Sequence, residues 1–430
     1  MFYSRLSLHS LLHNRRQYIS LFLVCLVGTG IMIACQVLTD GMLSAVREKS
    51  RQYYGGDLQF IGGYDEHVGT TNAQELIQKI KPLFPNGVQF FERFDYDADD
   101  TSFYYEGERT RLRMLKGVDF ENEKDVFKDF TFVQGGAISL PEHNSILISA
   151  PIATKLGIHA GDEITLQVVT DGGYKNTMTL VVTGIFQDSS LFGMYTSYLD
   201  KAALCIVTAY PEQYTNRISI YYGKIPAPTP RAVKQLQHEL EGIYTMYPQT
   251  DDKHDFFDEL RREGSPRPQY ALITLDANII ELKLLIEAIR SVVMLVVVVL
   301  LAIIAVGIGS TYRVIVMKRI TEIGTYRALG MEPGGVRNLF LTETFYLLLS
   351  GFMAGTVLSL LISFVMSRFD FSFIPAFDLF LINGHIRPVY GFAKTMSLFF
   401  VMLVTTLLSV LFTIRNVVHI SPVGALATTN

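Results

Sequence analysis

Tryptophan is absent from this chain of 430 residues, and cysteine occurs only three times. Aromatic anchors at a membrane–water interface would therefore have to be tyrosines. Cys25 and Cys35 fall in the first long apolar run, and Cys205 stands alone in the more polar part. This spacing excludes a CxxC redox or metal motif and an internal disulfide in the polar part, which must be stabilised by its own core.

Motifs for catalysis and nucleotide binding are also missing. The chain has no GxxxxGK[ST] phosphate loop, so we expect no nucleotide cofactor in this chain. If its activity is driven by ATP, another polypeptide must bind ATP and Mg²⁺. It has no GxSxG, HExxH or SxxK motif with a plausible catalytic partner, which argues against an enzyme. The net charge of −4 gives no reason to expect nucleic-acid binding.

Metal-binding patterns are incomplete. Four acidic residues match positions 1, 3, 5 and 12 of an EF-hand calcium loop: Asp95, Asp97, Asp99 and Glu106. Asp100 stands where the sharp turn requires glycine, and the flanking segments favour strands, so we expect an acidic hairpin turn. Five of the nine histidines lie between residues 41 and 282 without ligand spacing, and no metal site is expected there: His67, His143, His159, His238 and His254.

Long apolar runs dominate what is present. Apolar residues make up 49% of the chain and charged residues 18%, with a mean hydropathy of +0.27, which predicts a membrane part joined to a soluble domain. Four uncharged stretches reach the roughly 20 residues that a helix needs to cross a bilayer. They lie between Arg16 and Asp40, Arg290 and Arg313, Glu343 and Arg368, and Lys394 and Arg415.

Lysine and arginine in the short loops predict the orientation of these spans. Basic residues gather in the N-terminal arm (Arg5, Arg15, Arg16), in the loop after the second span (Arg313, Lys318, Arg319, Arg327, Arg337) and in the C-terminal tail (Arg415). We place these three segments in the cytoplasm.

The predicted organisation follows from these spans. It comprises a cytoplasmic arm (1–16), a first transmembrane helix (17–40), an extracytoplasmic α+β domain with helical stalks (41–282), a stalk end with the second transmembrane helix (283–312), a cytoplasmic hairpin (313–338), a third transmembrane helix (339–367), a short external loop (368–393), a fourth transmembrane helix (394–415) and a cytoplasmic tail (416–430).

The N-terminus has a second interpretation. Arg15 and Arg16 before an apolar run resemble the start of a signal peptide, and Met32 to Cys35 resembles a lax lipoprotein-processing box. We favour a retained span, because the apolar run continues through Val37 and Leu38 and an even number of spans keeps both termini on one side.

The segment between the first two spans is predicted to be an α+β domain. Alternating apolar residues predict strands in DLQFIG, GVQFFERFDY, TSFYYEG, TRLRMLKGV, EITLQVV, TMTLVVTGIF and RISIYYG. Helical spacing is found in AQELIQKIKPLF, APIATKLGI, DKAALCIVTA and PRAVKQLQHELEGIYTMY, whereas residues 251–269 are polar and predict an exposed loop. Continuous helical patterns at 41–54 and 275–293 predict stalks, which either transmit displacement or merely overrun the bilayer.

The hairpin from Lys318 to Gly335 is predicted to contain a short amphipathic helix. Val316, Ile320 and Ile323 share one stripe with Arg327, and Gly330 suits a helix C-cap. On these features alone, an interfacial helix with snorkelling basic residues is the simpler interpretation.

Specific residues favour a second interpretation. The spacing RxxEIGxxRAxG, which covers Arg319, Glu322, Ile323, Gly324, Arg327, Ala328 and Gly330, resembles the signature of MacB/FtsX-like ABC transporter permeases. The resemblance continues through Phe340, Leu341 and Glu343, the stretch ILISAPIATKLGIHAGDEITLQV with LVVTGIF resembles the MacB-like periplasmic core, and IRNVVHISPVGALA resembles the family's ending.

The resemblance implies a non-catalytic permease subunit that works by mechanotransmission. The hairpin would be a coupling helix that docks on a cytoplasmic ABC ATPase subunit through Arg319, Ile320, Glu322, Ile323, Gly324, Arg327, Ala328 and Gly330. In this interpretation Ile320 and Ile323 are exposed apolar residues that anchor in a groove of the ATPase. Other implied partners are a second permease copy or paralogue, a periplasmic carrier or adaptor, and membrane lipid. Lipoprotein release of the LolC/LolE type is the favoured activity, ahead of MacB-like efflux of small molecules or peptides and FtsX-like control of external hydrolases.

The third span carries two features of its own. Gly351 and Gly355 form a GxxxG motif, which suits close helix packing either within one chain or between two copies. Glu343 lies near the cytoplasmic edge, where a carboxylate is costly unless it is paired or solvated, and Arg337 is a candidate partner.

Overall fold

The computed structural model describes residues 6–7, 9–11, 15–63, 69–97, 100–170, 172–188, 190, 192–263 and 268–415. The arm residue Arg5, Asp99 of the calcium-like pattern, His67 and the tail 416–430 lie outside these ranges. The described residues form two compact units. The helical unit draws on Met1–Leu43, Ile286–Phe369 and Ile386–Asn430, and the sheet unit on Ser44–Leu285 and Asp370–His385.

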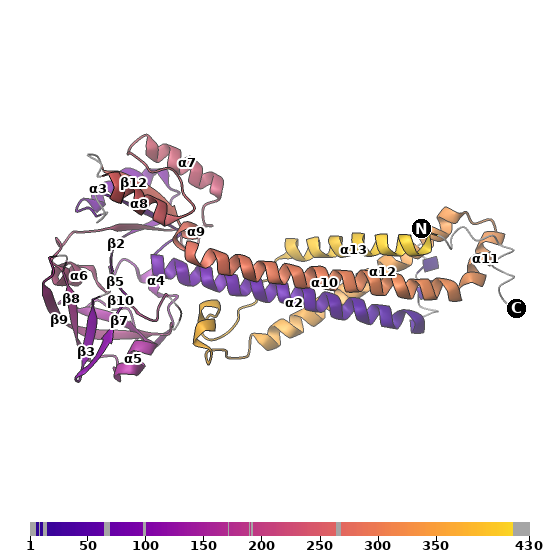
Figure 1. Cartoon of the computed structure of the whole chain (residues 1–430), viewed down its shortest axis with the longest axis horizontal. Helices are drawn as coiled ribbons and strands as arrows, with labels where there is room; N and C mark the ends of the chain where they lie inside the picture. The colour runs from indigo at the N-terminus through magenta and orange to yellow at the C-terminus, as the bar shows by residue number, and fades with distance from the viewer. Residues whose placement is uncertain are drawn as a thin grey trace. The chain divides into compact units, whose positions relative to one another are not determined.

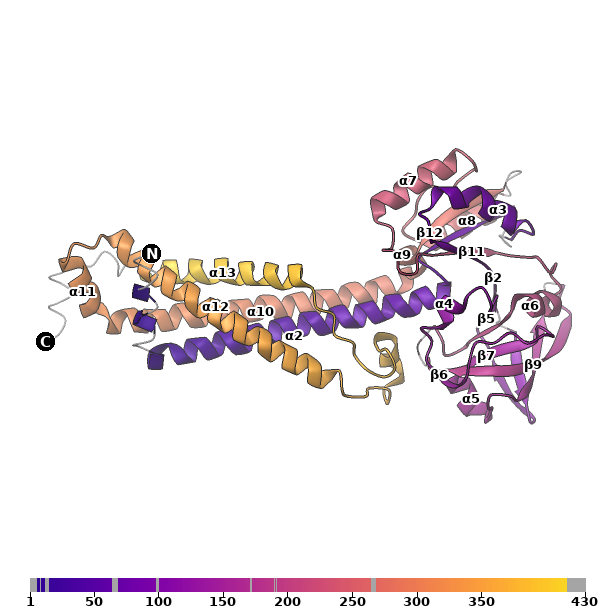
Figure 2. The ribbon, with the colours of Figure 1, turned by 180° about the vertical axis from the view of Figure 1, so that it is seen from behind.

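Four helices in the described part are long and apolar enough to cross a membrane, as predicted: α2 (Arg15–Tyr54), α10 (Ile280–Lys318), α12 (Pro333–Met366) and α13 (Phe392–Ile414). They run side by side in Figures 1 and 2. At 40 and 39 residues, α2 and α10 exceed what a bilayer core of about 30 Å requires. Both continue into the sheet unit, which confirms the predicted helical extensions, although a break at Ile279 separates α10 from the short helix α9 (Leu275–Asn278).

The helical unit has an apolar interior and an apolar exterior. Residues such as Met32, Ile308, Tyr312 and Met402 are fully buried between the helices. Many further apolar side chains face outward, including Leu295, Val306, Met353, Phe400 and Phe412. A helix that is apolar on all sides is typical of a membrane span, because lipid covers the outward face.

The strands of the sheet unit form one mixed sheet among the described residues. The strands are β1 (Leu58–Gly63), β2 (Gln89–Asp97), β3 (Ser102–Tyr105), β4 (Glu108–Arg111), β5 (Met114–Val118), β6 (Phe132–Gly135), β7 (Ser145–Ser149), β8 (Glu163–Val169), β9 (Lys175–Phe186), β10 (Thr196–Asp200), β11 (Arg217–Tyr221) and β12 (Gln269–Thr274). Their order is β12-β1-β11-β2-β5-β10-β7-β9-β8-β3-β4, with β6 on β9. Only the β5–β10 and β7–β9 pairs are parallel.

Helices cover the sheet in two groups (Figures 1 and 2). Near β12 and β1 lie α3 (Ala73–Ile80) with the 3-10 turn η1 (Lys81–Leu83), α7 (Pro230–Glu241) and α8 (Lys253–Glu263). Near β5, β7 and β9 lie α4 (Lys124–Phe127), α5 (Ala150–Leu156) and α6 (Lys201–Thr208). In the first group, α3 and α7 close an apolar core around Phe60 and Leu240, and in the second, α5 and α6 close one around Leu166 and Leu204. The helices α8 and α4 pack in smaller clusters of their own.

The predicted loop at 251–269 is wrong, because α8 occupies most of it. Its polar composition hides a narrow apolar face: Phe256 and Leu260, four residues apart, are both buried. The side chain of Asp252 accepts a hydrogen bond from the His254 amide at the start of this helix.

The predicted acidic hairpin turn is also wrong. β2 and β3 follow each other in sequence but are not neighbours in the sheet, so these two strands do not form a hairpin. Asp95 belongs to β2 and pairs with Lys116 of β5 at 2.7 Å. The strand predicted in TRLRMLKGV comprises two strands, β4 and β5, and no strand was predicted at β6, β7, β10 or β12.

Candidate functional site

The short helix predicted in the hairpin is present as α11 (Ile320–Ala328). It ends as expected at Gly330, whose φ of 94° lies in the left-handed region that glycine tolerates. The amide of Gly330 donates to the Arg327 carbonyl (3.1 Å) and that of Met331 to the Tyr326 carbonyl (3.0 Å), which is the Schellman pattern. The Nη1 of Arg327 also donates to the Met331 carbonyl (3.0 Å). This bond links the last turn of α11 to the residue that follows Gly330.

Arg319, immediately before α11, ties the hairpin to two spanning helices. Its Nη1 lies 3.1 Å from both carboxylate oxygens of Glu343 in α12 and 3.1 Å from the hydroxyl oxygen of Tyr18 in α2. The Tyr18 hydroxyl in turn donates to Glu343 (2.8 Å). The Arg319 Nε donates to Glu322 (2.8 Å), so one side chain contacts α2, α11 and α12.

This cluster is shielded from solvent. Glu343 is fully buried and Arg319 is 3% exposed. Tyr312 of α10, also fully buried, packs edge-on against Tyr18 with ring centroids 6.2 Å apart. A buried carboxylate and guanidinium are tolerated only when they are paired. Because Arg319 directly precedes α11 and must stay paired with Glu343 of α12, this contact fixes the position of α11 relative to the spans.

The structure divides the residues predicted to dock on an ATPase into two groups. Glu322, Ala328 and Gly330 are exposed, and Ile320 and Arg327 are half-buried. Arg319, Ile323 and Gly324 are buried. Ile323 was expected to be an exposed apolar anchor, and this is wrong, since it packs among residues such as Val316 and Phe340 in the core of the helical unit.

Sequence reasoning missed the exposed apolar residue of the hairpin. Leu329, at the C-cap of α11, is 82% exposed. It follows Arg327, the last residue of the predicted stripe, by two positions and directly precedes the Gly330 turn. The position of Leu329 next to the glycine that ends the helix was the sequence feature that could have indicated its exposure. Tyr18 and Tyr312 were also missed, since tyrosines near span ends are predicted as interfacial anchors. Arg337, considered as the partner of Glu343, is exposed.

The GxxxG motif packs within the chain. A Cβ on Gly351 would lie 2.5 Å from the Cβ of Cys25, and a Cβ on Gly355 would lie 3.0 Å from the backbone nitrogen of Gly30, both in α2. The same span that carries Glu343 is therefore in close contact with α2 along its length.

In the sheet unit, the end of α2 is tied into the sheet by side-chain caps. The Tyr54 carbonyl accepts hydrogen bonds from Gln59 and Ser219, each at 2.8 Å, and the Tyr53 carbonyl accepts one from Arg93 (3.2 Å). Arg93 is buried and paired with Glu123. These bonds satisfy the last carbonyl groups of the helix and leave it no freedom to slide against the sheet.

The short helix α9, which precedes α10, is tied to the same place. The Asn278 carbonyl, at the end of α9, accepts hydrogen bonds from the Tyr54 hydroxyl (3.0 Å) and from Lys253 (2.9 Å). The side chain of Asn278 donates to Gln59 (3.2 Å). Residues of both helical extensions thus share one buried hydrogen-bond network with β1 and α8.

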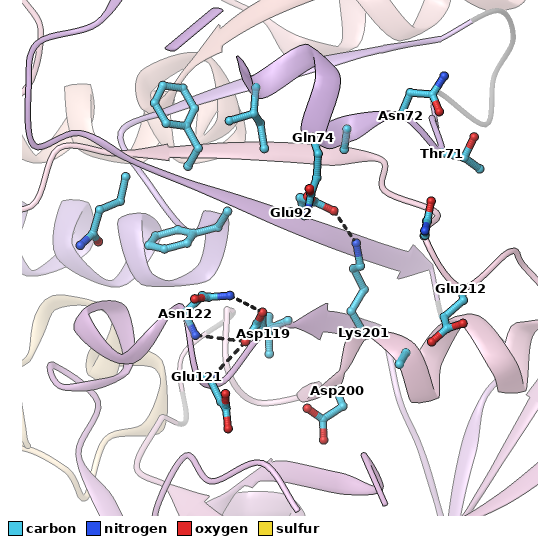
Figure 3. A pocket seen from close by; sticks show the side chains of 18 of the residues that line it. Thr71, Asn72, Gln74, Glu92, Asp119, Glu121, Asn122, Asp200, Lys201 and Glu212 are labelled. Atoms are coloured by element: carbon cyan, nitrogen blue, oxygen red, sulfur yellow. Dashed lines mark hydrogen bonds and ion pairs between the residues drawn. The ribbon is translucent and has the colours of Figure 1, made fainter. Parts of the chain in front are cut away.

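An open cleft of about 1150 Å³ lies between α3 and β2 on one side and the ends of β5 and β10 on the other (Figure 3). Lys201 spans it to Glu92 at 2.8 Å, and Asn122 bonds Asp119. The lining is acidic, with six carboxylates and two lysines: Glu75, Glu92, Asp119, Glu121, Asp200, Glu212, Lys81 and Lys201. Such a wall suits a polar or positively charged surface and offers little to an acyl chain.

Comparison with known proteins finds a similarity over part of the chain. Residues 294–422 match the sequence family described as FtsX-like permease C-terminal. The match begins within α10 and covers the hairpin, α12 and α13, and it supports an ABC-type permease subunit. No curated protein matches the chain. With four apolar helices, the match indicates an inner-membrane protein, and a permease of this kind implies an ATPase partner.

Proposed function

We propose that this chain is the permease subunit through which a separate cytoplasmic ATPase drives an extracytoplasmic domain. The observation that carries the proposal is the buried contact of Arg319 with Glu343 and Tyr18. It makes α11 a rigid extension of the spans and not a loosely attached interfacial helix. ATP and Mg²⁺ would be bound by the ATPase, and this chain would itself be non-catalytic.

The orientation supports the same conclusion. Arg313, Lys318 and Arg337 are exposed around the hairpin and Arg415 is exposed at the end of α13. Basic residues of short loops stay in the cytoplasm, so we place α11 there and the sheet unit outside. Four spans then return both termini to the cytoplasm.

Two exposed features of the hairpin form the proposed docking surface. Leu329 supplies an apolar side chain that can enter a groove on the ATPase, and Glu322 supplies a charge at its rim. Arg319, Ile323 and Gly324 act differently: they hold α11 against the spans, so that force applied to Leu329 reaches α2 and α12.

The long helices would carry this force from the hairpin toward the sheet unit. A displacement of α2 and α10 would reach the sheet unit through the Tyr54 carbonyl network at the end of α2 and the Asn278 carbonyl network in α9, directly before α10. We propose that the work is used to release lipoprotein from the outer face of the inner membrane. A separate ATPase and a large external domain on four spans fit this use, with a second permease copy or paralogue completing the complex.

Copurification tests the docking surface. Leu329→Asp should abolish recovery of the ATPase with the full chain and the stimulation of its ATP hydrolysis, while membrane insertion remains intact. The matched control is Ile206→Asp, which places the same charge on an exposed apolar residue of α6 in the sheet unit. Normal recovery of the ATPase with Leu329→Asp would refute the docking assignment.

The cargo requires a separate test. A photo-crosslinker introduced on the sheet unit should capture lipoprotein in cells, and capture should increase when ATP hydrolysis is blocked. Capture of soluble peptides or drug-like compounds in place of lipoprotein would refute lipoprotein release without affecting the ATPase coupling.

A further inference from the structure

The segment Asp370–His385, between α12 and α13, has two contrasting faces. One face is buried: Leu379, Phe380 and Leu381 are at most 8% exposed. The other face presents Phe373, which is 75% exposed, and Ile374, which is 42% exposed. An isolated soluble domain gains nothing from holding a phenylalanine in water, since burying such a side chain is worth about 1.5–3 kcal/mol.

The buried face is attached to the sheet unit. Lys49 of α2 donates to the Asp378 carbonyl (2.8 Å) and pairs with the Asp378 carboxylate (3.1 Å). The same ammonium group lies 3.4 Å from Asp188. The Thr131 hydroxyl donates to Asn383. The segment is therefore a part of the sheet unit, although its sequence lies among the spans.

Both ends of the segment are connected to helices that are long and apolar enough to span a membrane. It follows α12, which ends at Met366, and it precedes α13, which begins at Phe392. Phe373 is seven positions after Met366, so the phenylalanine stays within about 25 Å of the helix end even if the chain is fully extended. Arg368, exposed between them, can keep its charge among lipid headgroups while the neighbouring aromatic ring enters the apolar layer.

We propose that Phe373 and Ile374 insert into the outer leaflet of the bilayer, so that Asp370–His385 anchors the sheet unit to lipid. The anchor rests on the membrane placement given above and adds a second attachment of the sheet unit, besides its long helices. Lipid acyl chains are the occupant that the chemistry favours, because the exposed pair is apolar and its flanking chain leads into spanning helices on both sides.

The absence of tryptophan from the chain allows a direct test. Phe373→Trp creates a single reporter in the full-length protein, which is placed in nanodiscs made with brominated or ordinary lipids. Phe400→Trp, on the exposed face of α13, is the positive control: it measures the quenching of tryptophan fluorescence at a position in the membrane. Tyr174→Trp, at an exposed position of the sheet unit beside β9, is the negative control: it measures the quenching of tryptophan fluorescence at a position in water.

We expect bromine to quench Phe373→Trp nearly as strongly as Phe400→Trp, while Tyr174→Trp keeps its fluorescence. Quenching of Phe373→Trp no greater than that of Tyr174→Trp would overturn the proposal. This includes the case in which a second copy of the chain covers the residue, since protein would protect it from water without exposing it to bromine. The measurement needs no ATPase, so its failure is distinct from a failure of the docking experiment.

Discussion

The Cβ that Gly355 lacks would lie 2.8 Å from the carbonyl oxygen of Leu26 in the facing helix α2. The obstacle is backbone, so it cannot move aside as a flexible side chain would. We expect Gly355→Ala to push α12 from α2 and to lower the free energy of unfolding by about 1–3 kcal/mol, the usual cost of overpacking. Titration with denaturing detergent measures the change.

Gly307→Ala is the matched control for this substitution. Gly307 lies inside the spanning helix α10, and its added Cβ would meet only Val24, at the ordinary contact distance of 4.0 Å. Alanine favours helix over glycine by up to about 1 kcal/mol, so this variant should be as stable as the parent or slightly more stable. Equal losses in both variants would contradict the packing argument.

Removal of either partner of the Arg319–Glu343 pair should be strongly destabilising. Glu343→Leu leaves a buried guanidinium without its main counter-charge, and Arg319→Met leaves a buried carboxylate, each at a cost of about 3–5 kcal/mol. The double variant should cost clearly less than the sum, because no buried charge is left alone. A double-mutant cycle in detergent measures this coupling.

The pair Lys394–Asp40 provides the control for that cycle. It also joins two helices of the helical unit, at 2.6 Å, but the lysine side chain is 59% exposed. Exposed pairs contribute at most about 1 kcal/mol, so Lys394→Met should change stability little. Additive losses at Arg319 and Glu343 would show that the buried cluster does not act as one unit.

The sequence was most informative where one physical signal dominates. Charge-free length predicted the four spanning helices, and the Gly330 turn predicted the end of α11, because only glycine readily adopts its φ. The family match at 294–422 agrees with the resemblance seen in the hairpin. The coarse α+β nature of the sheet unit was also predictable from strand and helix periods.

Long-range pairing was the part that could not be predicted. Arg319 and Glu343 are 24 residues apart, and Tyr18 lies about 300 residues from Arg319, so no local pattern joins them. For the same reason Ile323 was assigned to an exposed face: its helix has weak amphipathicity, and only the packing of the spans shows which side is covered. The segment of α8 forms a helix because two of its residues are buried, although its polar composition predicted a loop.

The buried Lys116 predicts a pH-dependent stability of the sheet unit. Desolvation lowers its pKa to about 8, below the 10.5 of an ordinary lysine, although Asp95 opposes the shift. Between these two values the unfolded chain binds more protons than the folded chain, so this residue's contribution to stability increases as the pH rises from 8 to 10.5. In Lys116→Met this contribution is absent.

Urea unfolding of the full chain, followed through a Tyr174→Trp reporter in the sheet unit, measures this difference. The stability of the parent relative to Lys116→Met should rise with pH over that interval. As a control, Lys79→Met removes a lysine that is half-exposed and paired with Glu75, and it should show no such rise there. A pH-independent difference for Lys116 would refute the assignment.

The attachment of Asp370–His385 to the sheet unit depends mainly on Lys49, and its removal should release the segment. Lys49→Met takes away the bond to the Asp378 carbonyl and leaves the Asp378 side chain, 5% exposed, without its counter-charge. Local opening then costs less free energy, and we expect hydrogen–deuterium exchange in 377–385 to become several times faster. Exchange in β9 should stay unchanged, because its core does not involve Lys49. Unaltered exchange in 377–385 would mean that the buried apolar residues Leu379 and Leu381 hold the segment by themselves.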